Sequence, residues 1–255
     1  MCGIFSAPVQ ASGGMYRRNS AFSLAQSSHQ RFGTRSRVVA LFADMRGFSN
    51  WSETQPLDHV ADLVKQQFGY VVQICDEHHQ PFQKFLGDGF VLLWELASDE
   101  DLDRCLASAL DATFALHKGY ADLAQSLPYP APAGYGVGIS VGEAIRIQFE
   151  PYLSDSSEVD FVGYPLNCAA RMQTLASGFG TALCASTVAA LQGNPERYLR
   201  TLMPGFGRRL LTPPQDMLDR AAVTKGLKPA DREGFRHLSF VDGEEWLWRT
   251  PSVRQ

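Results

Sequence analysis

The fold is decided by two stretches of sequence, VVALFADMRGFSNWSE at residues 38–53 and QKFLGDGFVLLW at residues 83–94. The first places Asp44 at the end of an apolar run that is typical of a buried strand. The second places Asp88 in a Gly-Asp-Gly turn between two apolar runs, which is typical of a hairpin. The two carboxylates can therefore converge on one site. Such a pair suits Mg²⁺ or Mn²⁺, and two such ions can activate an attacking hydroxyl and stabilise a leaving pyrophosphate.

Hydrophobic periodicity predicts the other elements. A strand is expected at 37–43 and a helix from Leu57, where apolar residues recur at helical spacing. The further elements expected are a hairpin at 82–87 and 89–95, a helix at 100–120, strands within 133–150 with a turn or bulge at Gly142, a helix at 164–177, a strand at 181–185, a short helix at 186–191 and a C-terminal hairpin turning at Asp242-Gly243. This order matches a ferredoxin-like (palm-type) α+β sheet with its helices on one face.

Composition places the chain among globular proteins. Its 255 residues carry a net charge of −4, which argues against a dedicated nucleic-acid binder. The five cysteines form no CxxC pair, so their spacing predicts neither a zinc site nor a disulfide framework. Without a membrane-spanning apolar run or a signal-peptide layout, a cytoplasmic location is expected. We expect an N-terminal arm at 1–36, a core at 37–195 and a C-terminal extension completing the sheet at 196–255.

Two further features are candidates for binding phosphate. Gly47 and Phe48 follow Asp44 in a compact loop that can turn backbone amides toward phosphate oxygens. Asn167 and Arg171 are four residues apart and lie on one face of a predicted helix, where an amide beside a guanidinium suits an anionic transition state. The alternative for this second pair is a polar stripe on a solvated helix.

Three motifs in this order, FADMRGFS, KFLGDGF and DFVGYPLNCAARM, resemble the catalytic core of class III nucleotidyl cyclases over about residues 37–191. The resemblance implies that Asp44 and Asp88, with the carbonyl of Met45, bind two Mg²⁺ or Mn²⁺ ions. It also implies in-line attack of the ribose 3′-hydroxyl of a nucleoside triphosphate on its α-phosphate, which yields a 3′,5′-cyclic nucleotide and pyrophosphate.

The resemblance assigns further roles. Asn167 orients the ribose, Arg171 stabilises the transition-state phosphate, and Lys84 and Asp160 fall where family members read the base. It also implies a head-to-tail homodimer whose two sites draw residues from both subunits. Lys84 and Asp88, only four residues apart, would then serve opposite sites, and a monomer would be inactive.

The triphosphate ligands depart from the family pattern. Glu143 follows Gly142 where many relatives carry an arginine, and Arg146 is the nearest substitute. For the usual triphosphate lysine, the C-terminal part of the chain offers only candidates, namely Arg208, Arg209, Lys225 and Lys228.

The sequence does not decide which nucleobase the substrate carries. Lys84 can donate and Asp160 can accept a hydrogen bond, which fits adenine, cytosine or uracil and fits guanine poorly. Bulk at Phe161, Trp51 or Leu166 could limit pocket depth and so select a pyrimidine. The layout resembles freestanding bacterial pyrimidine cyclases of anti-phage signalling, which make cyclic UMP or cyclic CMP for a separate effector. UTP or CTP is therefore the expected substrate, with a freestanding adenylate cyclase making cyclic AMP as the alternative.

Two hypotheses from other functional classes compete with the nucleotidyl cyclase hypothesis. The segment LGDGFVLL is similar to the hairpin of diguanylate cyclases, but those lack the pattern of Asn167 and Arg171. An inactive cyclase-homology module that only binds nucleotide is the non-enzyme alternative. Loss of a metal-binding aspartate would indicate such a module, and both Asp44 and Asp88 are present.

Overall fold

A computed structural model describes residues 33–149, 158–199, 206–242 and 245–246. The strands are β1 (Thr34–Met45), β2 (Phe82–Leu86), β3 (Gly89–Leu96), β4 (Tyr135–Phe149), β5 (Glu158–Val162), β6 (Gly180–Leu183), β7 (Phe206–Leu211), β8 (Arg236–Asp242) and β9 (Glu245–Trp246). The helices are α1 (Phe48–Thr54), α2 (Leu57–Glu77), α3 (Leu102–Ser126), α4 (Tyr164–Leu175), α5 (Ala185–Gly193), α6 (Pro195–Tyr198), α7 (Gln215–Val223) and α8 (Pro229–Gly234), with a 3₁₀ turn at Asp99–Asp101 before α3.

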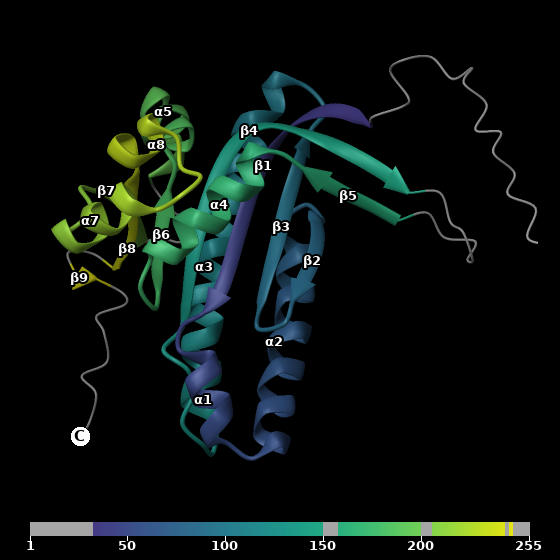
Figure 1. Cartoon of the computed structure of the whole chain (residues 1–255), viewed down its shortest axis with the longest axis vertical. Helices are drawn as coiled ribbons and strands as arrows, with labels where there is room; N and C mark the ends of the chain where they lie inside the picture. The colour runs from purple at the N-terminus through teal and green to yellow at the C-terminus, as the bar shows by residue number, and fades with distance from the viewer. Residues whose placement is uncertain (1–32, 150–157, 200–205, 243–244, 247–255) are drawn as a thin grey trace, which may run out of the picture.

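One mixed sheet contains the nine strands of the described residues, and its long path runs β2-β3-β1-β4-β6-β8-β7. The first four strands with α2 and α3 form the expected ferredoxin-like unit, because the chain order β1-α2-β2-β3-α3-β4 gives the sheet order β2-β3-β1-β4. β6 joins β4 in parallel after the crossover through α4. β8 and β7 then extend the sheet with strands from the C-terminal part of the chain (Figure 1).

The main core lies between one face of the sheet and helices α2 and α3. Alternate residues of β1, such as Val39 and Leu41, point into it, and Leu106 and Leu110 of α3 are fully buried there, as the periodicity predicts. The buried face of α2 differs from the simple apolar pattern. Gln67 is buried on this helix, whereas Phe68 is about half exposed, because the sheet contacts the helix one residue earlier in the turn.

Helix α4 lies on the opposite face, so the expectation that the helices share one face is wrong. Glycines make this close contact possible. A Cβ at Gly138 would overlap the carbonyl oxygen of Ala169, and one at Gly142 would stand 2.8 Å from Cγ of Pro165. The prediction of a turn or bulge at Gly142 is also wrong, because Gly142 pairs with Val38 inside the continuous strand β4.

The C-terminal part contains more regular structure than its sequence suggests. Helices α7 and α8 pack with α4 around a second, smaller core that includes Met172, Met217 and Phe235. The predicted final hairpin is confirmed in its pairing, since Val241 pairs with Trp246 and Asp242 with Glu245. Its turn at 243–244 lies outside the described residues, as does the predicted arm up to residue 32.

A buried histidine in α3 predicts how stability depends on pH. Burial lowers the pKa of His117 to about 3, and the charge of His237 acts in the same direction. Because an unfolded histidine titrates near pH 6.5, the unfolded chain binds a proton that the folded chain excludes as the pH falls from 6.5 toward 3. His117 should therefore cost about 2 kcal/mol of stability between pH 6.5 and pH 5.

Urea unfolding at a series of pH values measures this loss. His117→Gln keeps a side chain that can hydrogen-bond Thr181, the partner of His117 Nε2 at 2.9 Å. This variant should flatten the pH dependence. An equally steep loss of stability in the variant would contradict the assignment.

Candidate active site

Asp44 and Asp88 lie side by side at one end of the sheet. Asp44 pairs with Gly89, the residue that follows Asp88 in the hairpin. A positive φ of 75° at Gly87 is what a two-residue hairpin turn needs at its first central residue. Partial burial raises the pKa of Asp44, the nearby charge of Asp88 raises it further, and the Arg46 guanidinium opposes both. The two carboxylates thus feel each other's charge, as convergence on one site requires.

Arg46 connects Asp44 to the end of α4. Its Nη1 lies 3.2 Å from Asp44 Oδ2, and its Nε donates to the carbonyl of Ala176 at 3.0 Å. Its Nη2 donates to both the backbone carbonyl and the side-chain carbonyl of Gln173. The guanidinium fits because Gly136, beneath it, carries no side chain. Arg46 therefore fixes the strand that carries Asp44 against the helix that carries Asn167 and Arg171.

Gln67 supports the backbone of the turn that carries Asp88, from the opposite face of the sheet. Its Nε2 donates to the backbone carbonyl of Asp88 at 3.1 Å. Neither Gln67 nor Arg46 is among the residues predicted from the sequence. A polar residue on an otherwise apolar helix face is the signal that could have indicated Gln67, and Arg46 lies between Asp44 and Gly47 in the DMRGF segment.

The loop after Asp44 is shorter than expected because α1 starts at Phe48. Gly47 precedes this helix with φ 76°, in the left-handed region that favours glycine. The Phe48 ring packs on the main core and lies 5.7 Å from the Trp51 ring. The Met45 side chain is also buried in that core. Only backbone groups of these residues are therefore suited to contact a ligand.

Lys84 and Asp160 form an ion pair at 2.6 Å, although 76 residues separate them. The second half of β4 curves with β5 toward β2 and β3 (Figure 1). The centres of the Phe161 and Phe82 rings lie 5.2 Å apart, and Leu166 packs against the same small cluster. Partial burial acts to raise the pKa of Asp160, but hydrogen bonds from Lys84 and the amide of Phe161 lower it overall.

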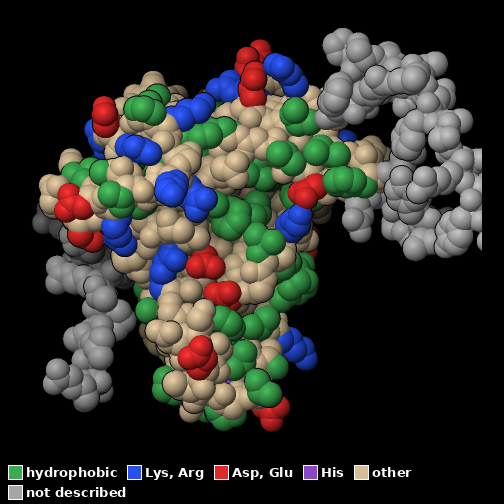
Figure 2. All heavy atoms as spheres, viewed as in Figure 1, with side chains coloured by type: hydrophobic (Ala, Val, Ile, Leu, Met, Phe, Trp, Pro, Cys, Tyr) green, Lys and Arg blue, Asp and Glu red, His purple; other side chains and the backbone are tan. Residues whose placement is uncertain are grey.

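Asn167 and Arg171 are both exposed on α4. They share the sheet face that carries Asp44, because α4 packs on that face and Arg46 contacts both parts. In Figure 2, acidic and basic side chains lie next to one another near the middle of this face. Trp51 is different, because its indole donates to the carbonyl of Pro130 at 2.6 Å and its ring lies beside the rings of Phe48 and Tyr129. Trp51 therefore does not narrow the surroundings of Asp160.

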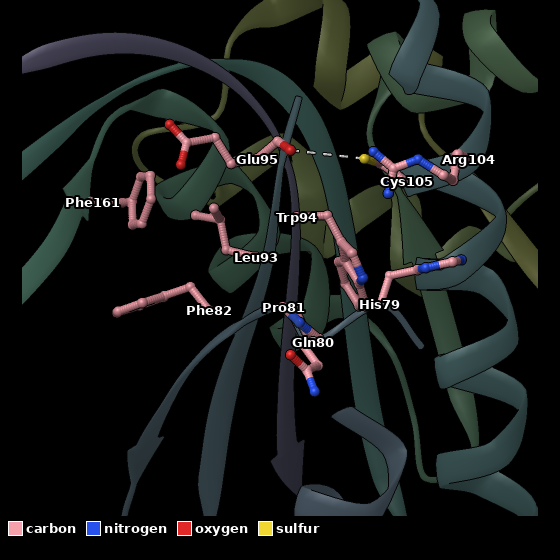
Figure 3. Close-up of a pocket in the computed structure, with 10 residues that line it drawn as sticks. All are labelled: His79, Gln80, Pro81, Phe82, Leu93, Trp94, Glu95, Arg104, Cys105 and Phe161. Atoms are coloured by element: carbon pink, nitrogen blue, oxygen red, sulfur yellow. Dashed lines mark hydrogen bonds between the residues drawn. The ribbon is translucent and has the colours of Figure 1, made fainter. Parts of the chain in front are cut away.

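A small hollow lies beside this region, at the edge formed by β2 and β3 (Figure 3). Its volume is about 220 Å³, with Phe82 and Phe161 on one side and Trp94 and His79 on the other. Typical ligand pockets start near ~300 Å³, so the hollow is too small for a whole nucleoside triphosphate.

No family model matches the chain. Two uncharacterized proteins of Mycobacterium tuberculosis, Rv1319c and Rv1320c, are 30% and 26% identical to it over 165 residues, or 64% of this chain. The match spans 29% and 27% of their lengths, so the chain covers less than a third of these curated relatives.

Solved structures give broader matches. The adenylyl cyclase CyaB from P. aeruginosa has a TM-score of 0.62 at 17% identity, covering 82% of this chain and 95% of that one. The guanylyl cyclase Cya2 has a TM-score of 0.56 at 19% identity, covering 88% and 98%. The chain has the fold of a class III adenylyl or guanylyl cyclase catalytic domain.

Within this cyclase fold, Asp44 and Asp88 fit a hard divalent cation. Arg46 engages only Oδ2 of Asp44, while Oδ1 lies over Gly89, where an added Cβ would stand 3.0 Å from it. The second oxygen therefore faces the turn that carries Asp88. Carboxylate and carbonyl oxygens are the ligands that Mg²⁺ and Mn²⁺ prefer.

The candidate triphosphate ligands differ in their availability. Arg208 is buried and pairs with Asp111, and its Nη1 donates to Tyr198 O at 3.2 Å, so a phosphate role for Arg208 is wrong. Arg146 lies 3.7 Å from Glu95. The Lys228 ammonium sits 4.0 Å from the centre of the Tyr164 ring. Arg209 and Lys225 are exposed.

Among the helices of the described segments, none has the length and apolarity needed to cross a membrane.

Arg46→Gln should lower the free energy of unfolding by about 3 kcal/mol, because it removes charged hydrogen bonds and leaves carbonyls at the end of α4 without their donor. Urea unfolding measures the change. Arg37→Gln on the same strand is the control, since it removes only an exposed pair with Asp99 and should cost about 0.5 kcal/mol. Equal effects of the two substitutions would show that Arg46 does not secure α4.

Proposed function

We propose that the chain is a nucleotidyl cyclase that converts a nucleoside triphosphate into a 3′,5′-cyclic nucleotide and pyrophosphate. The observation that carries this proposal is the adjacency of Asp44 and Asp88 on the sheet face that also bears the Lys84–Asp160 pair and α4. The fold supports it, because the solved structures that share it include adenylyl and guanylyl cyclases. We take residues 37–195 as the catalytic core and residues 196–255 as the extension that completes the sheet.

Each candidate residue has a role in this proposal. Asp44, Asp88 and the Met45 carbonyl would hold two Mg²⁺ or Mn²⁺ ions, which supply activation of the 3′-hydroxyl and neutralisation of the leaving pyrophosphate. Asn167 would orient the ribose, and Arg171 would donate to the phosphate on which negative charge develops.

The remaining roles concern the phosphates and the base. Backbone amides of Gly47 and Phe48 would bind phosphate oxygens, and the left-handed conformation of Gly47 supports this role. Lys84 and Asp160 would open their mutual ion pair and bind the base edge instead.

We propose a pyrimidine substrate, UTP or CTP, and ATP as the alternative. A donor beside an acceptor at Lys84 and Asp160 can bind the edges of all three of these bases. The Phe82–Phe161 contact and Leu166 support the smaller bases, because they place apolar bulk beside Asp160. Cyclic UMP or cyclic CMP read by a separate effector in anti-phage signalling stays a prediction of the sequence resemblance.

We also propose a head-to-tail homodimer with two composite sites. In this arrangement Asp44 and Asp88 of one subunit face Asn167 and Arg171 of the other. The exposure of Asn167 and Arg171 within a single chain supports the arrangement, because both side chains are free to reach a ligand shared with a partner.

The first test is turnover of the purified chain with ATP, GTP, CTP and UTP in Mn²⁺, with products identified by mass spectrometry. Asp44→Asn and Asp88→Asn should each reduce turnover by at least about 1000-fold, because several kcal/mol of metal-dependent charge stabilisation is lost. Asp58→Asn, a carboxylate in the first turn of α2, is the control and should leave turnover unchanged. Full activity of either metal-site variant would refute the two-metal mechanism.

Mixing subunits tests the composite site. A dimer of one Asp88→Asn chain and one Arg171→Ala chain should contain one intact site, so the mixture should recover about a quarter of wild-type turnover if subunits exchange at random. Each variant alone should be nearly inactive. Mixed dimers that are confirmed by native mass spectrometry but remain inactive would contradict the head-to-tail arrangement.

A further inference from the structure

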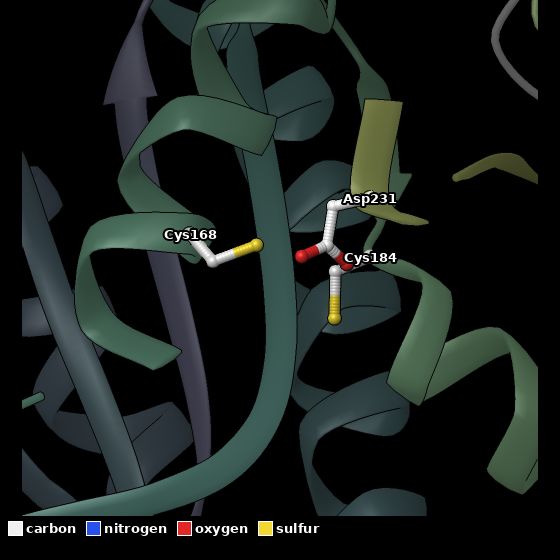
Figure 4. A group of neighbouring side chains, drawn as sticks. All are labelled: Cys168, Cys184 and Asp231. Atoms are coloured by element: carbon white, nitrogen blue, oxygen red, sulfur yellow. The ribbon is translucent and has the colours of Figure 1, made fainter. Parts of the chain in front are cut away.

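A second cluster of metal-ligating side chains lies beneath α4, apart from the Asp44–Asp88 pair. It joins Cys168 of α4, Cys184 just before α5 and Asp231 of α8 (Figure 4). One ligand atom from each residue lies within 4.8 Å of the others, and all three residues are buried. The sequence predicted no zinc site because these residues form no short-spaced motif. The crossover through α4 and β6 is what brings them together.

We propose that Cys168, Cys184 and Asp231 bind one zinc ion or a similar soft divalent cation. Two thiolates and a carboxylate select zinc over Mg²⁺, because Mg²⁺ prefers an all-oxygen set. The Ser140 hydroxyl, 3.2 Å from Cys184 Sγ, offers an oxygen for a fourth position. This site stands independently of the proposed cyclase activity.

Asp231 is held as a metal ligand is held in known sites. Its Oδ2 accepts a hydrogen bond from the Tyr164 hydroxyl at 2.6 Å, and its Oδ1 accepts one from the amide of Ala185 at 3.0 Å. Each oxygen keeps a further lone pair. Ligating carboxylates are characteristically oriented by such second contacts.

Charge is the strongest argument for a cation. Asp231 is only 6% exposed, yet among the described residues no Lys or Arg forms an ion pair with it. A buried carboxylate without a cation is costly, and a metal ion would supply the missing positive charge. The partial positive charge at the N-terminus of α5, next to Cys184, also favours a thiolate.

The two thiols can become metal ligands by losing their protons. On metal binding, both S–H bonds break, two metal–sulfur bonds form and two protons leave to solvent. A disulfide is the competing outcome, but it would require an oxidant to reach two buried sulfurs and would leave Asp231 without a cation.

The bound ion would tie together three elements of the structure. Cys168 directly follows Asn167 on α4, so the ion would anchor this helix to α5 and α8 from below. Its effect would therefore appear first in stability and in the position of α4.

Titration of the purified, reduced full-length chain tests the proposal. After metal removal by a chelator, Zn²⁺ is added in competition with a chromophoric chelator, and Co²⁺ is used as a spectroscopic substitute. We expect one equivalent of zinc, a rise in the unfolding temperature, and thiolate-to-cobalt absorption bands that excess Mg²⁺ does not remove. Cys168→Ser and Cys184→Ser should each weaken binding by more than about 100-fold.

Two controls keep the result interpretable. Cys75→Ser and Cys105→Ser remove buried free cysteines outside the cluster and should bind zinc like the wild type. Tyr164→Phe removes only the hydroxyl that supports Asp231 and should weaken binding by about 10-fold in a folded chain. A folded wild-type chain that binds no zinc, retention of binding in the Cys168→Ser, Cys184→Ser double variant, or a Cys168–Cys184 disulfide in the unreduced chain with no bound metal would each overturn the proposal.

Discussion

The direct contact between α4 and β4 is the constraint on which the candidate site depends. On this face β4 carries glycine at Gly136, Gly138 and Gly142, so the Arg46 guanidinium lies over the first, the α4 backbone over the second and the Pro165 ring over the third. A methyl group at Gly138 would overlap the helix itself. Because β4 has no side chains at these glycines, α4 can approach the sheet closely. This close approach sets the position of Asn167 and Arg171.

The same face gathers charges from distant parts of the chain. Asp44 comes from β1, Lys84 from β2 and Asp160 from β5, which the bend of β4 brings back over the sheet. Each of these groups already has an internal partner, Arg46 for Asp44 and Lys84 for Asp160. Such ion pairs orient the side chains before a ligand arrives. A ligand that breaks an ion pair must replace its contacts, which lowers the net affinity.

Local patterns were sufficient for much of the architecture. The strand ending at Asp44, the hairpin around Asp88 and the helix carrying Asn167 all follow from short-range periodicity and turn chemistry. The sequence could not show which face of the sheet each helix covers. A glycine within β4, such as Gly142, predicts a turn or bulge as long as the helix that packs on it is unknown. The role of Arg46 was missed for the same reason, since its acceptors lie 127 and 130 residues further along the chain.

Arg46 has a consequence for how two sites would behave together. In a head-to-tail dimer, Asp44 and Arg171 of one subunit belong to different sites, and Arg46 joins the strand of the first to the helix of the second. Nucleotide and metal binding in one site would then be mechanically linked to the phosphate-binding helix of the other. Cooperativity between the two halves of such a dimer, in either direction, would then have a path through this guanidinium, beside the direct packing of α4 on the sheet.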